Sequence, residues 1–239
     1  MQRIEVNSED CLPYLDGSKF DDYKRFYLKL STSGNDRISC LRNIVEGKSV
    51  LHIGFCDHLP LFDARIAQDL WLHRHLIEVT TRCVGIDINS EAVATISSKT
   101  QIDDLYCGDV SKPGVSVIGE QDWDFAIFPD VIEHIPDPRQ FLCGFVESYR
   151  NNVKRVLISV PNTQRAGALK GSLFGFETIN SDHCAEYSPY TLAKLAAGAG
   201  ISDFKFHYCG YSDVGLLKSA LFKIFPRLSD SLILEGAIQ

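Results

Sequence analysis

Acidic side chains follow several apolar stretches that have the pattern of buried strands. Asp87 ends "RCVGID", Asp109 lies near the end of "DLYCGDV", and Asp130 and Glu133 follow "WDFAIFP". Carboxylates accept hydrogen bonds from hydroxyls and amines and attract positive charge, but together they serve the phosphates of a nucleotide poorly. The GxxxxGK[ST] motif of phosphate-binding loops does not occur in the sequence. We therefore expect a ligand with hydroxyls, an amine and a net positive centre.

Two histidines near these acids could transfer a proton. His183 follows Asp182 in the polar segment "NSDHCAEYS", and His134 lies in "VIEHIPDP". Imidazole titrates near neutral pH, and a positioned general base contributes typically about 10²–10⁴-fold to a rate. We predict His183 as the base and His134 as the second candidate, with a structural role for His134 before Pro136 as an equal alternative. Three acids near a histidine could hold Mg²⁺, but no spacing is diagnostic, so we predict no metal.

The segment "VLHIGFCDH" at 50–58 runs from a predicted buried strand into a glycine and a short turn. Gly54 has no side chain, so a ligand can approach its backbone closely. Asp57 follows in the turn and adds a further carboxylate. An ordinary turn after a core strand is the alternative interpretation of a single glycine.

Strand and helix patterns alternate from residue 49 onward. Helical spacing or capping signals predict helices at 61–80, at 90–99 with Ser90 as cap, at 137–151 and at 188–200 with Ser188 as cap. Apolar runs predict strands at 49–55, 82–88, 104–110, at the start of 123–135, and at 153–162, 203–211 and 230–238. This alternation predicts a parallel sheet with helices on both faces, where ligands bind at the carboxyl ends of the strands.

The composition narrows the class of protein. The chain has 239 residues, of which 45% are hydrophobic, so one large domain can form. A net charge of -7 argues against binding to nucleic acid, which requires a basic face. No apolar run has membrane-spanning length, and the first residues show no secretory signal. The eight scattered cysteines lack zinc or CxxC spacing, so we expect a reducing, cytoplasmic environment.

The ordered set of motifs resembles class I S-adenosylmethionine-dependent methyltransferases over about residues 35–238. "VLHIGFCDH" corresponds to the glycine motif, "VGIDIN" to the ribose-binding acid, "CGDV" to the adenine-side acid, and "WDFAIFPDVIEHIPDP" to the most specific motif, on the fourth strand. "DHCAEYSPYTLAKLAAGAGI" is similar to O-methyltransferases of the ubiquinone-biosynthesis type. "VLHIG", a long helix with "WLH" and "GIDIN" are similar to methyltransferase-like proteins of surface-polysaccharide loci. The sequence departs from the family at His52, where an acid is usual, and at "GFCDH", where GxGxG is usual.

The resemblance implies a Rossmann-like, seven-stranded, mostly parallel sheet with helices on both faces and an antiparallel last strand. It also implies that S-adenosylmethionine is the cofactor. Asp87 would accept hydrogen bonds from the ribose hydroxyls, Asp109 would accept one from the adenine amine, and Asp57 would replace the missing acid near the ammonium group. Taken singly, Asp87 and Asp109 could instead each cap a following helix. The predicted cofactor-binding residues are Gly54, Phe55, Asp57, Asp87, Ile88, Asp109, Val110, Pro129 and Asp130.

The implied reaction is transfer of the sulfonium methyl group in one in-line displacement, for which the enzyme mainly positions the partners. We expect O-methylation of a small molecule or glycan hydroxyl, with a surface-polysaccharide sugar favoured. A non-catalytic binding or regulatory protein of the same fold is the alternative, and "GFCDH" favours it slightly. An NAD-dependent enzyme is disfavoured because GxGxxG is absent and an acid follows the third strand.

We expect a single domain over 1–239, with a helical cap at 1–48, a cofactor-binding half at 49–162 and a substrate half at 163–239. The loop 161–182 is a predicted lid or acceptor pocket, and its Arg165 and Lys170 are the only concentrated positive charge expected near the cleft, where they could meet an acidic acceptor. The segment 215–228 combines apolar bulk with lysines and an arginine. It could contact a membrane surface or partner weakly, although an insertion that packs on the domain is favoured.

Overall fold

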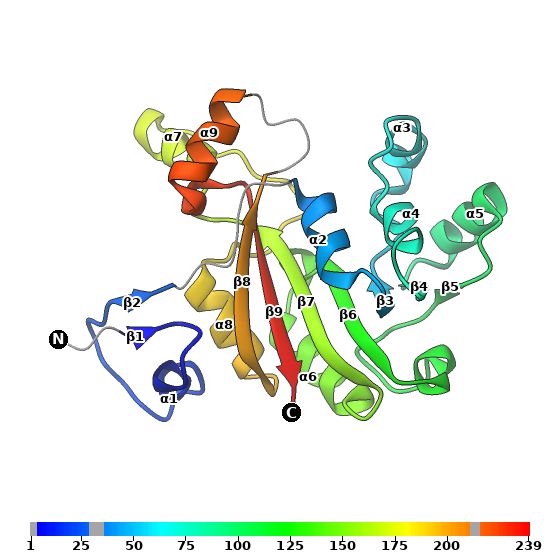
Figure 1. Cartoon of the computed structure of the whole chain (residues 1–239), viewed down its shortest axis with the longest axis horizontal. Helices are drawn as coiled ribbons and strands as arrows, with labels where there is room; N and C mark the ends of the chain where they lie inside the picture. The colour runs from blue at the N-terminus through cyan, green and yellow to red at the C-terminus, as the bar shows by residue number, and fades with distance from the viewer. Residues whose placement is uncertain (1–3, 29–35, 211–215) are drawn as a thin grey trace.

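A seven-stranded sheet forms the centre of the molecule (Figure 1). The computed structural model describes residues 4–28, 36–210 and 216–239, without the side chains of 216, 217 and 219. The strand order is β5-β4-β3-β6-β7-β9-β8; β9 is antiparallel to both neighbours and the other adjacent pairs are parallel. This confirms the predicted sheet. The strands are β3 (Ser49–Ile53), β4 (Arg82–Asp87), β5 (Leu105–Cys107), β6 (Trp123–Pro129), β7 (Val153–Pro161), β8 (Ile201–Cys209) and β9 (Ser231–Ile238).

The strand order reverses between β3 and β6. The chain passes outward from β3 to β4 and β5, and then returns to place β6 on the other side of β3. The segments that leave adjacent strands at such a reversal diverge, which opens a crevice at the carboxyl ends of the strands. The predicted site residues follow β3, β4, β5 and β6, so the topology brings them to this crevice.

Helices cover both faces of the sheet. In β6, Phe125 and Ile127 pack in one apolar cluster with α2 (Arg37–Val45) and α4 (Leu72–Ile77), whereas Ala126 and Phe128 belong to the cluster that includes α6 (Pro138–Tyr149) and α8 (Pro189–Ala197). Burial on both faces explains why the central strands are almost continuously apolar in sequence.

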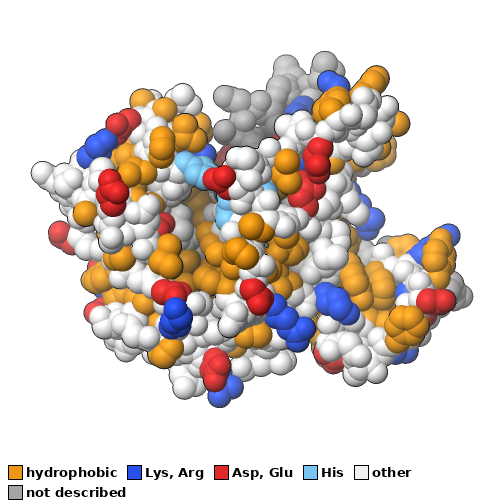
Figure 2. Space-filling model, turned by 180° about the vertical axis from the view of Figure 1, so that it is seen from behind, with side chains coloured by type: hydrophobic (Ala, Val, Ile, Leu, Met, Phe, Trp, Pro, Cys, Tyr) orange, Lys and Arg blue, Asp and Glu red, His pale blue; other side chains and the backbone are white. Residues whose placement is uncertain are grey.

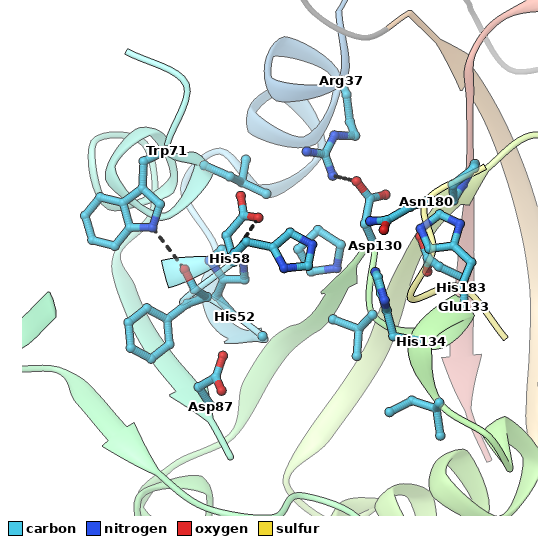
Figure 3. Close-up of a pocket in the computed structure, with 18 of the residues that line it drawn as sticks. Arg37, His52, His58, Trp71, Asp87, Asp130, Glu133, His134, Asn180 and His183 are labelled. Carbon is cyan, nitrogen blue, oxygen red and sulfur yellow. Dashed lines mark hydrogen bonds and ion pairs between the residues drawn. The ribbon is translucent and has the colours of Figure 1, made fainter. Parts of the chain in front are cut away.

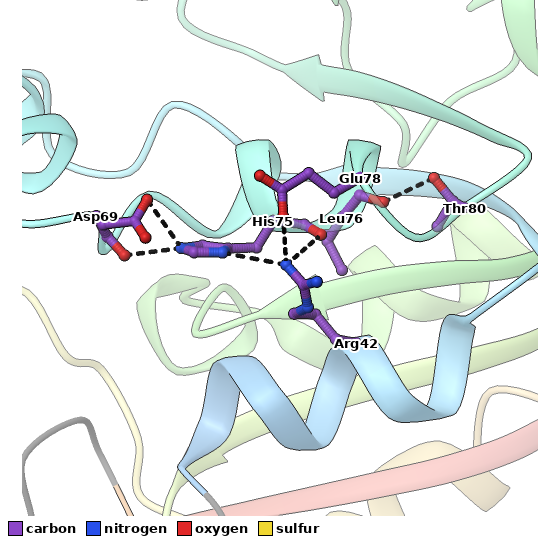
Figure 4. A network of polar contacts seen from close by, with 6 residues as sticks. All are labelled: Arg42, Asp69, His75, Leu76, Glu78 and Thr80. Carbon is purple, nitrogen blue, oxygen red and sulfur yellow. Dashed lines mark hydrogen bonds and ion pairs between the residues drawn. The ribbon is translucent and has the colours of Figure 1, made fainter.

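A polar network joins α2 to α4 (Figure 4). The Arg42 guanidinium donates to Glu78 Oε2 at 2.6 Å and to the carbonyl oxygen of His75 at 3.3 Å. The His75 ring in turn contacts the carbonyl oxygen of Asp69 at 2.7 Å. These bonds hold α2 against α4.

The predicted helix over 61–80 is interrupted. The chain forms η2 (Leu59–Leu61), α3 (Phe62–Ala67) and then α4, with Asp69 in the left-handed region at φ 57°. The Trp71 indole donates to the carbonyl oxygen of Phe55 at 2.9 Å, which fixes the interruption against the turn after β3. The apolar spacing continues across the break, and for this reason it indicates one helix where there are two.

Other local predictions also differ from the structure. The cap of α5 (Ser90–Thr100) is Asn89, whose side chain accepts from the Ala92 amide, and not Ser90. The loop 161–182 contains α7 (Ala166–Phe174). Ser188 caps α8 as predicted, with Pro189 at the first helical position.

The first 48 residues are not simply a helical cap. Before α2 they form two short strands, β1 (Ile4–Glu5) and β2 (Phe26–Tyr27), which pair in parallel, together with η1 (Glu9–Cys11) and α1 (Leu12–Leu15). The Phe26 ring stacks on Tyr190 of α8 at a centroid distance of 4.7 Å. The strands are only two residues long, which is too short for a periodic pattern to show in sequence.

The segment 215–228 is an insertion between β8 and β9, as favoured from the sequence. Its described part forms α9 (Leu216–Ile224) and η5 (Pro226–Leu228), and residue 215 lies outside the described residues. Phe222 is buried, so α9 packs on the domain. Of the helices in the described ranges, none is long and apolar enough to cross a membrane.

Candidate active site

Two neighbouring pockets lie at the carboxyl ends of the strands. The larger has a volume of about 730 Å³ and the smaller about 500 Å³, and both are lined by Gly54, Asp87 and Ile88. Figure 2 shows a hollow on this side of the molecule, with histidine side chains beside acidic ones at its edge. All predicted site residues line one or both pockets. The smaller pocket is lined by Gly54, Phe55, Asp57, Asp87, Ile88, Pro129, Asp130, His134 and His183. The larger pocket is lined by Gly54, Asp87, Ile88, Asp109 and Val110.

Asp87 lies at the junction of the two pockets. Its Oδ1 accepts from the Asn89 amide at 2.9 Å, and its Oδ2 accepts from the Cys56 amide at 3.3 Å. The carboxylate therefore ties the end of β4 to the turn after β3. Each carboxylate oxygen has further lone pairs, so Asp87 can also accept from a ligand's hydroxyls.

Asp109 lines the larger pocket and also holds the turn after β5. Its Oδ1 accepts from the amide and hydroxyl of Ser111 at 3.0 and 2.6 Å, and Lys112 lies 2.9 Å from Oδ2. These bonds, first of all that from the Ser111 hydroxyl, hold the pKa of Asp109 below its usual value. Asp109 holds this turn and does not cap a helix, because the next helix, η3 (Ser116–Glu120), has Val115 at its N-cap.

Gly54 is required by the turn itself. Its φ of 77° lies in the left-handed region, and an added Cβ would lie 2.6 Å from Cγ2 of Val131. The sequence suggests that Gly54→Val would block a ligand and leave the protein folded. The structure indicates instead that this substitution would strain the backbone and displace Val131, so it is not a clean test of ligand binding.

Two ion pairs line the smaller pocket. Arg37 of α2 lies 2.6 Å from Asp130 Oδ2, and Figure 3 shows the two side chains directed toward each other. Arg65 of α3 lies 2.8 Å from Asp57 Oδ2. The pocket thus contains paired charges of both signs.

The predicted role of Arg165 and Lys170 as the positive charge near the cleft is not supported. Neither residue lines either of the two pockets, whereas Arg37 and Arg65 do. Arg165 instead donates to Glu186 Oε1 and to the carbonyl oxygen of Thr178, both at 2.9 Å, and so fixes the segment after β7. The positive charge of Arg165 is therefore paired with Glu186 within the protein.

Glu133, His134 and His183 form a cluster at one side of the smaller pocket. Their potential ligand atoms all lie within 4.8 Å of one another. The rings of His134 and His183 meet edge to face at a centroid distance of 4.7 Å. Burial, followed by the nearby His134, lowers the pKa of His183, which therefore favours the neutral imidazole that a base requires.

Glu133 is the most deeply buried acid of the site, with an exposed fraction of 0%. Neither carboxylate oxygen has a hydrogen-bond partner among the residues that the structure describes. Burial, together with the nearby Asp130, raises the pKa of Glu133 to about 8. The Asp182 carboxylate accepts from the Ser181 hydroxyl, and the Asp182 amide donates to Asn180 Oδ1.

No protein-family model matches the sequence, and no curated protein matches it. Solved structures do match the fold. Magnesium protoporphyrin IX methyltransferase from Synechocystis, with bound S-adenosylhomocysteine, has a TM-score of 0.53 and 14% identity over 84% of this chain and 82% of that chain. The chain has the fold of the S-adenosylmethionine-dependent methyltransferases.

Two further methyltransferase structures give the same TM-score. A possible histamine N-methyltransferase from Thermotoga maritima has a TM-score of 0.53 and 14% identity over 84% of this chain and 87% of that chain. The small RNA methyltransferase HEN1 has a TM-score of 0.53 and 17% identity over 90% of this chain, which spans only 27% of the HEN1 chain. At these identities the likeness concerns the fold.

Within this methyltransferase fold, β3 carries a histidine at the position where the resemblance implies an acid. His52 is buried, and its Nδ1 lies 3.1 Å from Nδ1 of His73 in α4. Burial lowers the pKa of His73 to about 3, and burial together with His73 and Arg37 lowers the pKa of His52 well below its usual value. Both imidazoles are therefore neutral at physiological pH, and no carboxylate charge comes from this position.

Several residues in and beside this crevice have no signal in the sequence. Arg37 belongs to no motif, and Arg65 and His73 lie in a segment whose apolar spacing suggests one regular helix. Arg37 and Arg65 line the smaller pocket, and the buried His73 contacts His52 of β3. These positions follow from how α2, α3 and α4 pack near the strand ends. Asn180, which also lines the smaller pocket, is brought there by the segment that follows α7.

Proposed function

We propose that this protein is an S-adenosylmethionine-dependent methyltransferase. The observation that carries the proposal is the ordered placement of Gly54, Asp87 and Asp109 along two joined pockets at the strand ends of a methyltransferase fold. S-adenosylmethionine supplies an activated methyl group on a sulfonium. The residues of this chain would bind it and orient the acceptor toward that carbon.

The larger pocket fits the adenosine part of the cofactor in this proposal. Asp87 would accept from the ribose hydroxyls, Asp109 from the adenine amine, and Ile88 and Val110 offer apolar contact to the ring. The methionine part would pass over Gly54 into the smaller pocket.

Charges of both signs in the smaller pocket support this orientation. The amino-acid end of S-adenosylmethionine carries an ammonium and a carboxylate. The pairs Arg37–Asp130 and Asp57–Arg65 offer partners for both groups, because each pair joins a cation to an anion at the pocket wall. They supply the negative charge that His52 does not.

The acceptor in this proposal is a hydroxyl of a small molecule or glycan, with a surface-polysaccharide sugar favoured. The resemblance of "DHCAEYSPYTLAKLAAGAGI" and of "GIDIN" to enzymes of those types supports it. The acceptor oxygen would attack the methyl carbon, the C–O bond would form as the C–S bond breaks, and the hydroxyl proton would leave. His183, the predicted base, and His134 both line this pocket.

Calorimetric titration with S-adenosylmethionine, S-adenosylhomocysteine and NAD tests the cofactor half of the proposal. We expect saturable binding of both adenosyl compounds and none of NAD. Methyl transfer from labelled cofactor to a panel of glycans and small hydroxyl compounds tests the reaction. Binding of S-adenosylhomocysteine without transfer to any acceptor would favour the non-catalytic alternative, which the neutral His52 also favours. Absence of binding would remove the methyltransferase proposal and leave the non-catalytic alternative.

We also propose a cytoplasmic location and a weak contact with an anionic membrane surface. All eight cysteines are free thiols, which supports a reducing compartment.

Figure 1 shows α7 and α9 at the end of the sheet where β7 ends and β9 begins. Exposed cations in this region are Lys170, Lys218, Lys223 and Arg227. Exposed apolar side chains there are Leu169, Leu173, Phe174, Phe176, Ile179, Ile224 and Phe225. Apolar side chains mixed with cations are typical of segments that bind anionic lipid surfaces.

A further inference from the structure

We propose that Glu133, His134 and His183 bind a divalent transition-metal ion. The three side chains offer one carboxylate oxygen and two imidazole nitrogens, all within 4.8 Å of one another. Figure 3 shows the cluster on the side of the pocket opposite Trp71 and Asp87. This inference replaces the sequence-based expectation of no metal.

The burial of Glu133 is the independent observation that points to a cation. The side chain is fully buried, and among the described residues no group donates a hydrogen bond to either of its oxygens. A buried carboxyl group without a hydrogen-bond partner is costly, and native proteins rarely keep one without a role. His183 Nδ1 is also buried without a partner in the described part of the chain. Three potential metal-ligand atoms, the two Glu133 oxygens and His183 Nδ1, are therefore buried without a hydrogen-bond partner in the described part of the chain.

Backbone bonds hold the two halves of the cluster together. The carbonyl oxygen of Glu133 accepts from the amides of Cys184 and Ala185 at 2.7 and 3.3 Å. The Cys184 thiol lies 3.6 Å from the carbonyl oxygen of His134. The residues that follow His183 are thus bound directly to the turn that carries the other two ligands, so backbone bonds bring the two segments together.

The donor set selects the class of ion. Imidazole nitrogens suit Zn²⁺, Fe²⁺ and similar first-row ions, whereas Mg²⁺ and Ca²⁺ prefer sites made of oxygen ligands. Bond lengths of about 2.0–2.2 Å place tetrahedral ligands about 3.3 Å apart, so side-chain movements of about 1 Å would close the site. Three protein ligands leave at least one position open. Asp130 is already paired with Arg37 and is not needed as a ligand.

The role of the ion in catalysis rests on the proposed function. An acceptor hydroxyl bound at the open position would lose its proton more readily, because the cation stabilises the resulting oxygen anion. That oxygen would form the bond to the methyl carbon as the C–S bond breaks, and the released proton would pass to solvent. The two histidines would then hold the metal, in place of the predicted role of His183 as base.

Metal binding can be measured without any methyl acceptor. The protein is freed of metal with a chelator and titrated with Zn²⁺, Mn²⁺ and Mg²⁺ by calorimetry, and with Co²⁺ by visible absorption. We expect one ion per chain, with Zn²⁺ or Mn²⁺ bound at least about tenfold more tightly than Mg²⁺. The proposal is overturned if none of the transition ions binds saturably, or if Mg²⁺ binds as tightly as they do.

Substitutions of the three side chains test whether they are the ligands of the ion. Glu133→Gln and His183→Ala should each weaken Zn²⁺ binding about tenfold or more, because each removes one of three ligands. His75→Ala is the matched control, since His75 lies in the network between α2 and α4 and should leave the affinity unchanged. If Glu133→Gln fails to fold, His183→Ala provides the test of the site. His183 is only partly buried in a surface segment, so this variant should fold. Unchanged affinity in His183→Ala would refute the site.

The same variants separate this inference from the proposed function. His183→Ala should bind S-adenosylhomocysteine as tightly as the wild type, because Asp87 and Asp109 are unchanged. A protein that binds Zn²⁺ but no S-adenosylhomocysteine would keep the metal site and lose the methyltransferase proposal. If transfer is observed and a chelator leaves it unaffected, the catalytic role of the ion is excluded and His183 remains the candidate base.

Discussion

At the scale of single residues, Asp87 is the sharpest test of the cofactor. Its carboxylate already accepts from two backbone amides and borders both pockets. Asp87→Asn keeps the shape of the side chain but removes the charge that strengthens bonds to ribose hydroxyls. Each such bond contributes about 1.5–3 kcal/mol at most. We therefore expect S-adenosylhomocysteine affinity to fall about tenfold or more, measured by calorimetry.

The control for this substitution is Asp63→Asn. Asp63 is an exposed acid of α3 that pairs with Lys99 and borders neither pocket. Its loss should leave the affinity for S-adenosylhomocysteine unchanged. Equal affinities of wild type and Asp87→Asn, with both proteins folded, would show that the ribose is not held at this position.

The buried imidazole pair predicts a pH dependence of stability. The folded pKa of His73 is about 3, below the value near 6.5 expected in the unfolded chain. Between these values only the unfolded state binds the proton, so the stability contributed by His73 is complete above pH 6.5 and is lost as the pH falls. His73 alone should lower the free energy of unfolding by roughly 2 kcal/mol at pH 5.

Denaturant unfolding of wild type and His73→Gln at several pH values measures this effect. Glutamine does not titrate, so the difference in unfolding free energy between the two proteins should shrink as the pH falls from 7 to 5. Two parallel stability curves would mean that His73 is protonated in the folded protein or is not buried.

At the scale of elements, α7 and α9 carry exposed apolar side chains that the domain core does not use. Leu173 and Phe174 of α7 are 72% and 73% exposed. We expect the protein to sediment with vesicles that contain anionic lipid at low salt. Leu173→Ser combined with Phe174→Ser should reduce the bound fraction, because the apolar contact is lost.

Phe20→Ser provides the comparison for this surface. Phe20 is 86% exposed but belongs to the N-terminal segment, which lies beside α8 and not beside α7 (Figure 1). Its substitution should leave vesicle binding unchanged. Binding to neutral vesicles as strong as to anionic ones would contradict the role of Lys170 and Lys223, and absence of binding to either would exclude the membrane contact.

At the scale of the whole molecule, the sheet predicts that the cofactor-binding and substrate halves unfold together. β7, the last strand of the first half, pairs with β9 from the end of the chain. We expect one cooperative transition, with amides of β3 and β9 exchanging hydrogen at similar free energies. Saturating S-adenosylhomocysteine should stabilise both strands, by about 2.7 kcal/mol at one hundred times its dissociation constant. Protection confined to β3 would show that the halves are independent units.

The sequence determined the sheet and the position of its binding edge. Apolar runs of strand length alternate with helical spacing, and burial on both faces of a sheet imposes that pattern directly on the residues. Gly54, Asp87 and Asp109 follow three of these strands, so their approach at one edge follows from a parallel sheet alone. For the same reason Ser188 could be recognised as a helix cap, since capping depends only on near neighbours in the chain.

The tertiary structure alone decided which distant groups meet. Arg37 pairs with Asp130, His52 contacts His73, and Glu133 lies beside His183, although none of these pairs is close in sequence. Such contacts depend on how α2, α4 and the segment after α7 pack against the strand ends. The spacing of apolar residues along a helix or strand indicates which of its sides is buried, but it does not indicate which other element packs against that side. The charges and ligands of the smaller pocket therefore became visible only in the folded chain.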